Sequence, residues 1–124
     1  MPRTEVYFYQ ESEGDVPVLA WLKKLERKNR RAANKCQAAI ERLIELGHEL
    51  RRPEADLLRD GIYELRVRVG RVNYRLLYFF HGQGIAILAH GLVKEKSVPK
   101  ADIERAIQRK IRFETKPEFH TYKE

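Results

Sequence analysis

Apolar and polar residues alternate along three consecutive segments in the second half of the chain, which predicts three β-strands. We expect the strands to span about residues 62–69, 72–80 and 85–92. The first two are joined by Gly70-Arg71, and a two-residue loop with glycine first is typical of a type II′ hairpin turn. Residues 81–84 join the next two strands. The three segments therefore predict an antiparallel meander.

Apolar residues recur at helical spacing in two segments of the first half, residues 18–25 and 32–44. The basic segment 27–31 separates them, so they predict an antiparallel helical hairpin. Residues 6–9 form a short aromatic run that predicts a strand before the hairpin. After the meander, Pro99 opens a last helix.

The predicted order of elements is β-α-α-β-β-β-α, with an antiparallel-rich sheet packed on the helical hairpin, so the fold class is α+β. We expect Asp15 to cap the first helix, with Pro17 in its first turn. Residues 1–114 contain neither a repeat nor a low-complexity segment and are expected to form one domain. Pro117 interrupts residues 115–124, a tail that is either docked or frayed.

The two-residue turn also fixes the register of the hairpin, because pairing follows by counting back from it. Val69 pairs with Val72, and paired residues share a face of the sheet. The apolar face, expected to pack on the helices, carries Tyr63, Leu65, Val67, Val69, Val72, Tyr74, Leu76 and Tyr78. The polar face, expected to be open, carries Glu64, Arg66, Arg68, Asn73 and Arg75.

In this register Arg66 lies directly opposite Arg75, and facing like charges destabilise a strand pair by a few tenths to about 1 kcal/mol. An anion between the two guanidinium groups would relieve that repulsion, and guanidinium matches phosphate oxygens bidentately. The alternative is an ordinary solvated polar face. The prevalence of arginine favours an anion-binding face. The repulsion also predicts that one of the two variants, Arg66→Ala or Arg75→Ala, is slightly more stable than the parent.

The formal net charge of +7 and the pI near 9.7 point to an anionic partner. Nucleic acid is the leading candidate, and a membrane surface or an acidic protein is the alternative. The chain has no apolar run long enough to cross a membrane and no signal-peptide pattern near its start, so we expect a soluble, cytoplasmic protein.

No metal or nucleotide cofactor is expected. The single cysteine, Cys36, lies in an apolar helical stripe and is predicted to be buried. No histidine has the spacing of a metal ligand, and His90 is expected to have a structural role. Gly82 and Gly84 belong to a hairpin turn rather than a phosphate-binding loop.

Residues 57–107 contain Gly-Ile-Tyr-Glu-Leu-Arg, Tyr-Arg-Leu-Leu-Tyr and His-Gly-Leu-Val-Lys. This segment resembles the HigB-like, phage-derived branch of the RelE/ParE superfamily of toxins from type II toxin–antitoxin systems. The resemblance implies an endoribonuclease that cuts mRNA, usually on the ribosome, and inhibits translation. It also implies a cognate helix-turn-helix antitoxin. The alternatives are a non-catalytic toxin that binds DNA gyrase, as ParE relatives do, and an RNA-binding regulatory module.

The resemblance also implies roles for individual residues. The implied catalytic residues are Glu64, Arg66, Arg75 and Lys94. The implied RNA-binding residues are Arg68, Arg71, Asn73 and Lys96. In such a site the RNA 2′-hydroxyl attacks the adjacent phosphorus, Glu64 or a lysine takes its proton, and arginines hold the phosphate. Lys94, His120 or Tyr122 would protonate the leaving oxygen.

Overall fold

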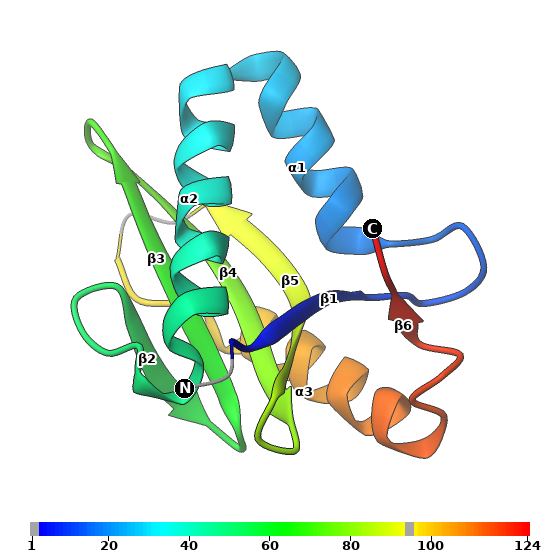
Figure 1. Cartoon of the computed structure of the whole chain (residues 1–124). Coiled ribbons are helices and arrows are strands. Elements are labelled where there is room, and N and C mark those ends of the chain that lie inside the picture. The colour runs from blue at the N-terminus through cyan, green and yellow to red at the C-terminus, as the bar shows by residue number, and fades with distance from the viewer. Residues whose placement is uncertain (1–2, 94–95) are drawn as a thin grey trace.

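The computed structural model describes residues 3–93 and 96–124, and in it a six-stranded sheet lies between two helical layers (Figure 1). The helices α1 and α2 pack on one face of the sheet, and α3 packs on the other. The α+β class is therefore confirmed. In chain order the elements are β1 (Glu5–Tyr9), α1 (Pro17–Lys28), α2 (Arg30–Leu46), the 3₁₀ turn η1 (Gly47–Glu49), β2 (Ala55–Arg59), β3 (Ile62–Val69), β4 (Val72–His81), β5 (Ile85–Val93), α3 (Lys100–Thr115) and β6 (Thr121–Tyr122).

The strands lie in the order β2-β3-β4-β5-β1-β6, and the β1–β5 pair is the parallel one. The predicted register of the β3–β4 hairpin is confirmed from Val69 opposite Val72 to Glu64 opposite Leu77. Gly70 has a φ of +62°, whereas Asp60 is the one described non-glycine residue with a positive φ. Because the left-handed conformation falls on Gly70 and not on Arg71, the turn has the expected type II′ character.

Two strands of the sheet, β2 and β6, were not predicted from the sequence. The strand β2 follows Pro53 and contains Leu57 and Leu58 side by side, with an irregularity in its pairing between Leu57 and Arg59. It therefore lacks the alternation that marked its neighbours. The strand β6 has two residues, too few to carry any pattern, and pairs with β1. Both are edge strands that depend on the neighbour they pair with.

The helical hairpin is tighter than the basic segment suggested, because Asn29 alone separates α1 from α2. The Asn29 side chain accepts a hydrogen bond of 3.1 Å from the backbone N–H of Ala32 and so caps α2. The expected cap of α1 is wrong: Val16 occupies that position without a side-chain bond, and Asp15 belongs to the preceding turn. Pro17 leaves one fewer N–H to satisfy there.

The helical hairpin packs closely on the sheet at Gly91 of β5. A Cβ atom at Gly91 would lie 2.5 Å from Cδ2 of Trp21, so the indole of α1 occupies the space of the missing side chain. The ring of Trp21 also meets Tyr74 edge-on, with 6.5 Å between centroids. Most of the predicted apolar face lies in this core, although Val72 remains 38% exposed.

Candidate functional site

The polar face of the β3–β4 hairpin is only partly open, contrary to the expectation from the sequence. The side chains of Glu64 and Arg75 are 2% and 12% exposed, whereas that of Arg66 is 36% exposed. The reason is that α3 and the segment before it cover this side of the sheet around Leu77 and Phe79. Alternation along a strand separates the faces but does not show what covers each one.

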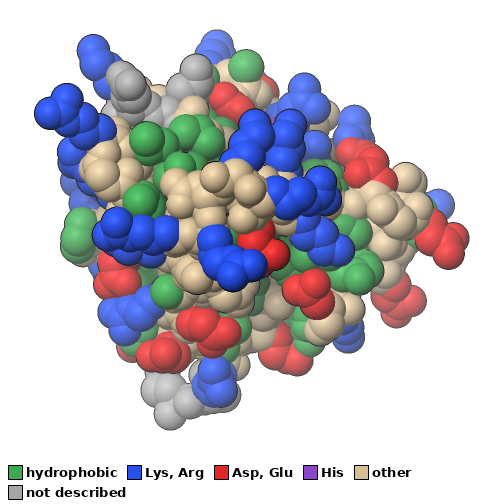
Figure 2. Space-filling model, turned by 90° about the horizontal axis from the view of Figure 1, so that it is seen from above, with side chains coloured by type: hydrophobic (Ala, Val, Ile, Leu, Met, Phe, Trp, Pro, Cys, Tyr) green, Lys and Arg blue, Asp and Glu red, His purple; other side chains and the backbone are tan. Residues whose placement is uncertain are grey.

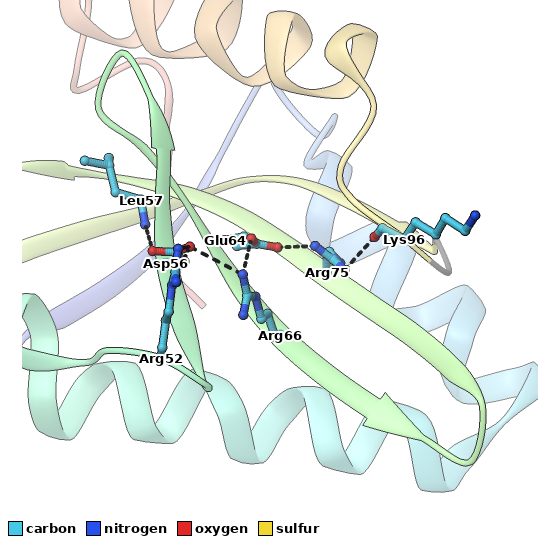
Figure 3. A network of polar contacts seen from close by, with 7 residues as sticks. All are labelled: Arg52, Asp56, Leu57, Glu64, Arg66, Arg75 and Lys96. Carbon is cyan, nitrogen blue, oxygen red and sulfur yellow. Dashed lines mark hydrogen bonds and ion pairs between the residues drawn. The ribbon is translucent and has the colours of Figure 1, made fainter.

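The facing arginines share a carboxylate that the protein itself supplies. Arg75 donates from Nη1 to Oε1 of Glu64 over 2.5 Å, and Arg66 donates from Nη2 to Oε2 over 3.2 Å (Figure 3). The carboxylate thus bridges the two guanidinium groups. The sequence predicted an external anion between the two arginines, whereas in the structure the side chain of Glu64 bonds to both of them.

The unpredicted strand β2 extends this network. Asp56 of β2 lies beside Arg66, with Oδ2 3.4 Å from Nη2, and Arg52 donates from Nε to the same oxygen over 2.9 Å (Figure 3). The hydrogen bond from Arg52 holds the pKa of Asp56 below its usual range. We name these five residues, Arg52, Asp56, Glu64, Arg66 and Arg75, the arginine–carboxylate cluster.

On its far side Arg75 is tied to the segment after β5. Its Nη2 donates to the backbone carbonyl of Lys96 over 2.6 Å, while the Lys96 side chain extends away from the cluster (Figure 3). The buried Nε of Arg75 has no hydrogen-bond partner among the described residues. Lys94, the fourth predicted catalytic residue, lies outside the described residues. Arg75 is therefore bonded both to Glu64 and to the backbone of Lys96.

The predicted RNA-binding residues of the hairpin lie toward its turn. Arg68 and Arg71 are exposed, and Arg68 donates from Nε to the carbonyl of Gly70 over 3.0 Å. Asn73 pairs with Arg68 across the strands and is half-buried. Arg68 and Asn73 therefore lie on the polar face next to the cluster, and Arg71 lies in the turn.

The structure separates His120 and Tyr122 from the cluster. Tyr122 is in β6, four strand positions from β3, which corresponds to about 19 Å at the usual strand spacing. His120 is buried, bonds to the carbonyl of Gln10 over 2.7 Å through Nδ1, and stacks on Tyr9. Neither side chain can therefore serve the same phosphate as Glu64.

His90 has its own partners between β5 and α3. Its Nε2 lies 2.7 Å from Oδ1 of Asp102, and Nη1 of Arg109 lies 3.3 Å from Nδ1. A guanidinium can only donate, so Nδ1 accepts and the ring proton resides on Nε2. Burial lowers the pKa of His90, which favours this neutral form. The three side chains join α3 to the sheet.

Two further findings concern the described part of the chain. Residues 3–93 and 96–124 contain no group of three or more His, Cys, Asp or Glu placed to hold a metal ion. No helix within these ranges combines the length and the apolar character that crossing a bilayer requires.

The fold and the cluster define a small α+β protein with a buried carboxylate held by arginines on the face of its sheet. The chain belongs to the family described as Phage derived protein Gp49-like (DUF891), whose sequence profile matches residues 20–111. This family is toxin-like and related to the RelE and HigB toxins. No curated protein matches the chain. The matched range contains the whole arginine–carboxylate cluster.

Proposed function

We propose that the protein is the toxin of a type II toxin–antitoxin system and that it cuts mRNA on the ribosome, in the cytoplasm. Its partner is a cognate helix-turn-helix antitoxin. One observation carries the proposal: an exposed arginine, Arg66, rests on a buried carboxylate, Glu64, in the middle of a basic strand pair. This arrangement can exchange an internal anion for a phosphate of RNA.

In the proposed reaction Arg66 turns from Glu64 to a non-bridging oxygen of the scissile phosphate. The 2′-oxygen bonds to phosphorus, its proton passes to Oε2 of Glu64, and the bond from phosphorus to the 5′-oxygen breaks. The departing oxygen takes a proton from Lys94, and the product is a 2′,3′-cyclic phosphate. RNA supplies the nucleophile and arginine stabilises the developing charge, so these steps require no further reactant.

The two arginines have different roles in this mechanism, which refines the expectation that both clamp the phosphate. Arg66 is 36% exposed and can reach an incoming strand, whereas Arg75 is 12% exposed and is held by Glu64 and Lys96. Arg75 is therefore a positioning residue that keeps the carboxylate beneath Arg66. Arg68, Arg71, Asn73 and the Lys96 side chain would bind the flanking nucleotides.

Primer extension on cellular messages after brief induction tests the proposal. The parent protein should produce discrete in-frame cuts, and Arg66→Ala should reduce cutting by about 10²–10³-fold, the usual cost of losing one preorganised donor. Arg42→Ala is the matched control, because Arg42 is also a partly exposed arginine with a carboxylate partner but lies on α2, on the opposite side of the sheet. It should leave the cuts unchanged.

Two results would contradict the proposal. Undiminished cutting by Arg66→Ala would remove Arg66 from the reaction. DNA breaks with intact messages would instead identify a toxin that acts on gyrase. Thermal melts of the purified variants show whether a loss of cutting reflects a loss of folding.

A further inference from the structure

A second basic region surrounds the junction of α1 and α2, and we name it the helical tip. Its side chains are all exposed: Lys23, Lys24, Arg27, Lys28, Arg30, Arg31 and Lys35. Glu26 is the one acidic residue between positions 16 and 40. Six of the seven net positive charges of the chain therefore belong to this segment. The rest of the chain, including the arginine–carboxylate cluster, is almost balanced.

The charges of the helical tip have no counter-ions among residues 3–93 and 96–124. None of the salt bridges between described residues involves the seven basic side chains. Lysine and arginine side chains gather over this end of the molecule in Figure 2. Arg30 and Arg31 also occupy the first turn of α2, where the helix dipole disfavours positive charge and no acidic residue is present. This arrangement lowers stability, and an external anion would reverse the effect.

The helical tip lacks the apolar surface that a protein or a membrane would need. The exposed large apolar residues of the described chain all lie elsewhere: Leu57, Val72, Val93, Ile111 and Phe119. Protein interfaces have an apolar centre and few lysines, and helices that lie on membranes insert apolar side chains. A surface made of exposed cations instead suits a sugar–phosphate backbone.

The form of the nucleic acid follows from the aromatic residues. Trp21 is the one aromatic residue of α1 and α2, and its ring packs against the sheet at Gly91 and Tyr74. The helical tip thus offers no ring on which an unpaired base could stack. Recognition of base-paired RNA depends on phosphates and shape, and requires no such ring.

We propose that the helical tip docks on the phosphate backbone of base-paired RNA, as a site separate from the strand that reaches Arg66. The turn of the β3–β4 hairpin and the α1–α2 junction point to the same end of the molecule (Figure 1). A folded RNA held at the helical tip would therefore keep an adjoining single strand close to Arg68 and Arg71. This binding does not depend on whether the cluster cuts RNA.

The test measures binding without cleavage. All proteins carry Arg66→Ala, and fluorescence anisotropy follows a labelled 16-base-pair RNA hairpin across a range of NaCl concentrations. The test variant replaces Arg27, Lys28, Arg30 and Arg31 by glutamine. The charge-matched control replaces Arg3, Arg51, Lys116 and Lys123 by glutamine, exposed cations outside both basic regions.

The test variant should bind at least about tenfold more weakly near 0.15 M salt, and its log–log salt slope should fall by about 3.6, because four contacts to duplex phosphates are lost. The control should change the dissociation constant less than about twofold. Equal losses in the two variants would overturn the proposal, since net charge alone would then explain binding. Retained RNA binding with lost antitoxin binding, or equal binding of the parent to anionic phosphatidylserine vesicles, would also overturn it. The pair Arg30→Gln and Arg31→Gln alone should lose binding in proportion, which gives a milder variant should the fourfold change not fold.

Discussion

The arginine–carboxylate cluster and the helical tip are both rich in arginine, but they differ in how their charges are compensated. In the cluster, Glu64 and Asp56 lie within 3.4 Å of the guanidinium groups that they serve. In the helical tip the cations face solvent, and none takes part in the salt bridges between described residues. A basic composition therefore has two separate consequences in this protein. Arginines paired with carboxylates fix the positions of the side chains in the cluster. Arginines without a carboxylate partner, as in the helical tip, attract an external anion.

The largest effect should come from breaking the buried pair. Arg75→Ala should lower the free energy of unfolding by about 3 kcal/mol, since it leaves Glu64 buried with Arg66 as its remaining partner. Urea denaturation measures the change. Arg68→Ala, on the same hairpin but exposed, should stay within about 0.5 kcal/mol of the parent. If Arg75→Ala were more stable than the parent, repulsion between Arg66 and Arg75 would outweigh their attraction to Glu64. The cluster would then be uncompensated, as the helical tip is.

A smaller loss should follow removal of the cap that shapes the helical tip. Asn29→Ala deletes the acceptor for the Ala32 N–H and should cost about 1 kcal/mol in urea denaturation. Asn34→Ala is the control, because Asn34 is exposed inside α2, where alanine has the better helix propensity. If both variants lose equally, the cap does not determine the shape of the junction.

The helical tip should respond to charge reversal with the opposite sign. Arg30→Glu should raise the free energy of unfolding by about 0.3–1 kcal/mol, since it puts a negative charge at the positive end of α2. Arg27→Glu should lower it by a similar amount, because Arg27 lies in the last turn of α1, where the dipole favours a cation. Thermal melts at low salt measure both. The same sign for both variants would contradict the dipole argument.

The smallest expected effect is a pH dependence in the outer part of the cluster. Arg52 lowers the pKa of Asp56 in the folded protein, so this pair stabilises the fold at pH values above the unfolded value of about 4, and the contribution is lost as pH falls through the folded value. The difference in melting temperature between the parent and Arg52→Ala should thus be present at pH 6 and become smaller as the pH falls below about 4. Arg51→Ala, an exposed neighbour, should show no such difference. A difference that stays constant from pH 6 down through the acid range would mean that Arg52 acts through packing.

The β3–β4 hairpin could be predicted well because the information that determines it is local. The two-residue turn sets the register and strict alternation sets the faces, so the position of Arg66 opposite Arg75 follows from the order of residues alone. The burial of Glu64 could not be predicted this way. The segment that covers Glu64 contacts the cluster through the hydrogen bond from Arg75 to the backbone carbonyl of Lys96, 21 residues further along the chain. Because every residue has a backbone carbonyl, the sequence does not indicate this contact.

The other two residues of the cluster, Arg52 and Asp56, could not be predicted because β2 lacks the alternation of polar and apolar residues that indicates a strand. Arg52 and Asp56 join Arg66 only because β2 pairs with β3, and adjacent leucines hid that strand. The positions of His120 and Tyr122 could not be predicted for a related reason. A tail that follows a helix can reach either side of the sheet, and here a two-residue strand draws it to β1.

The contact between Trp21 and Gly91 has a mechanical consequence. On the sheet side the contact surface is backbone, with no side-chain rotamer that can yield. At this point α1 meets the main chain of β5 directly, through the indole ring of Trp21. Because a Cβ atom at position 91 would lie 2.5 Å from Cδ2 of Trp21, Gly91→Ala would push α1 away from β5 at this point.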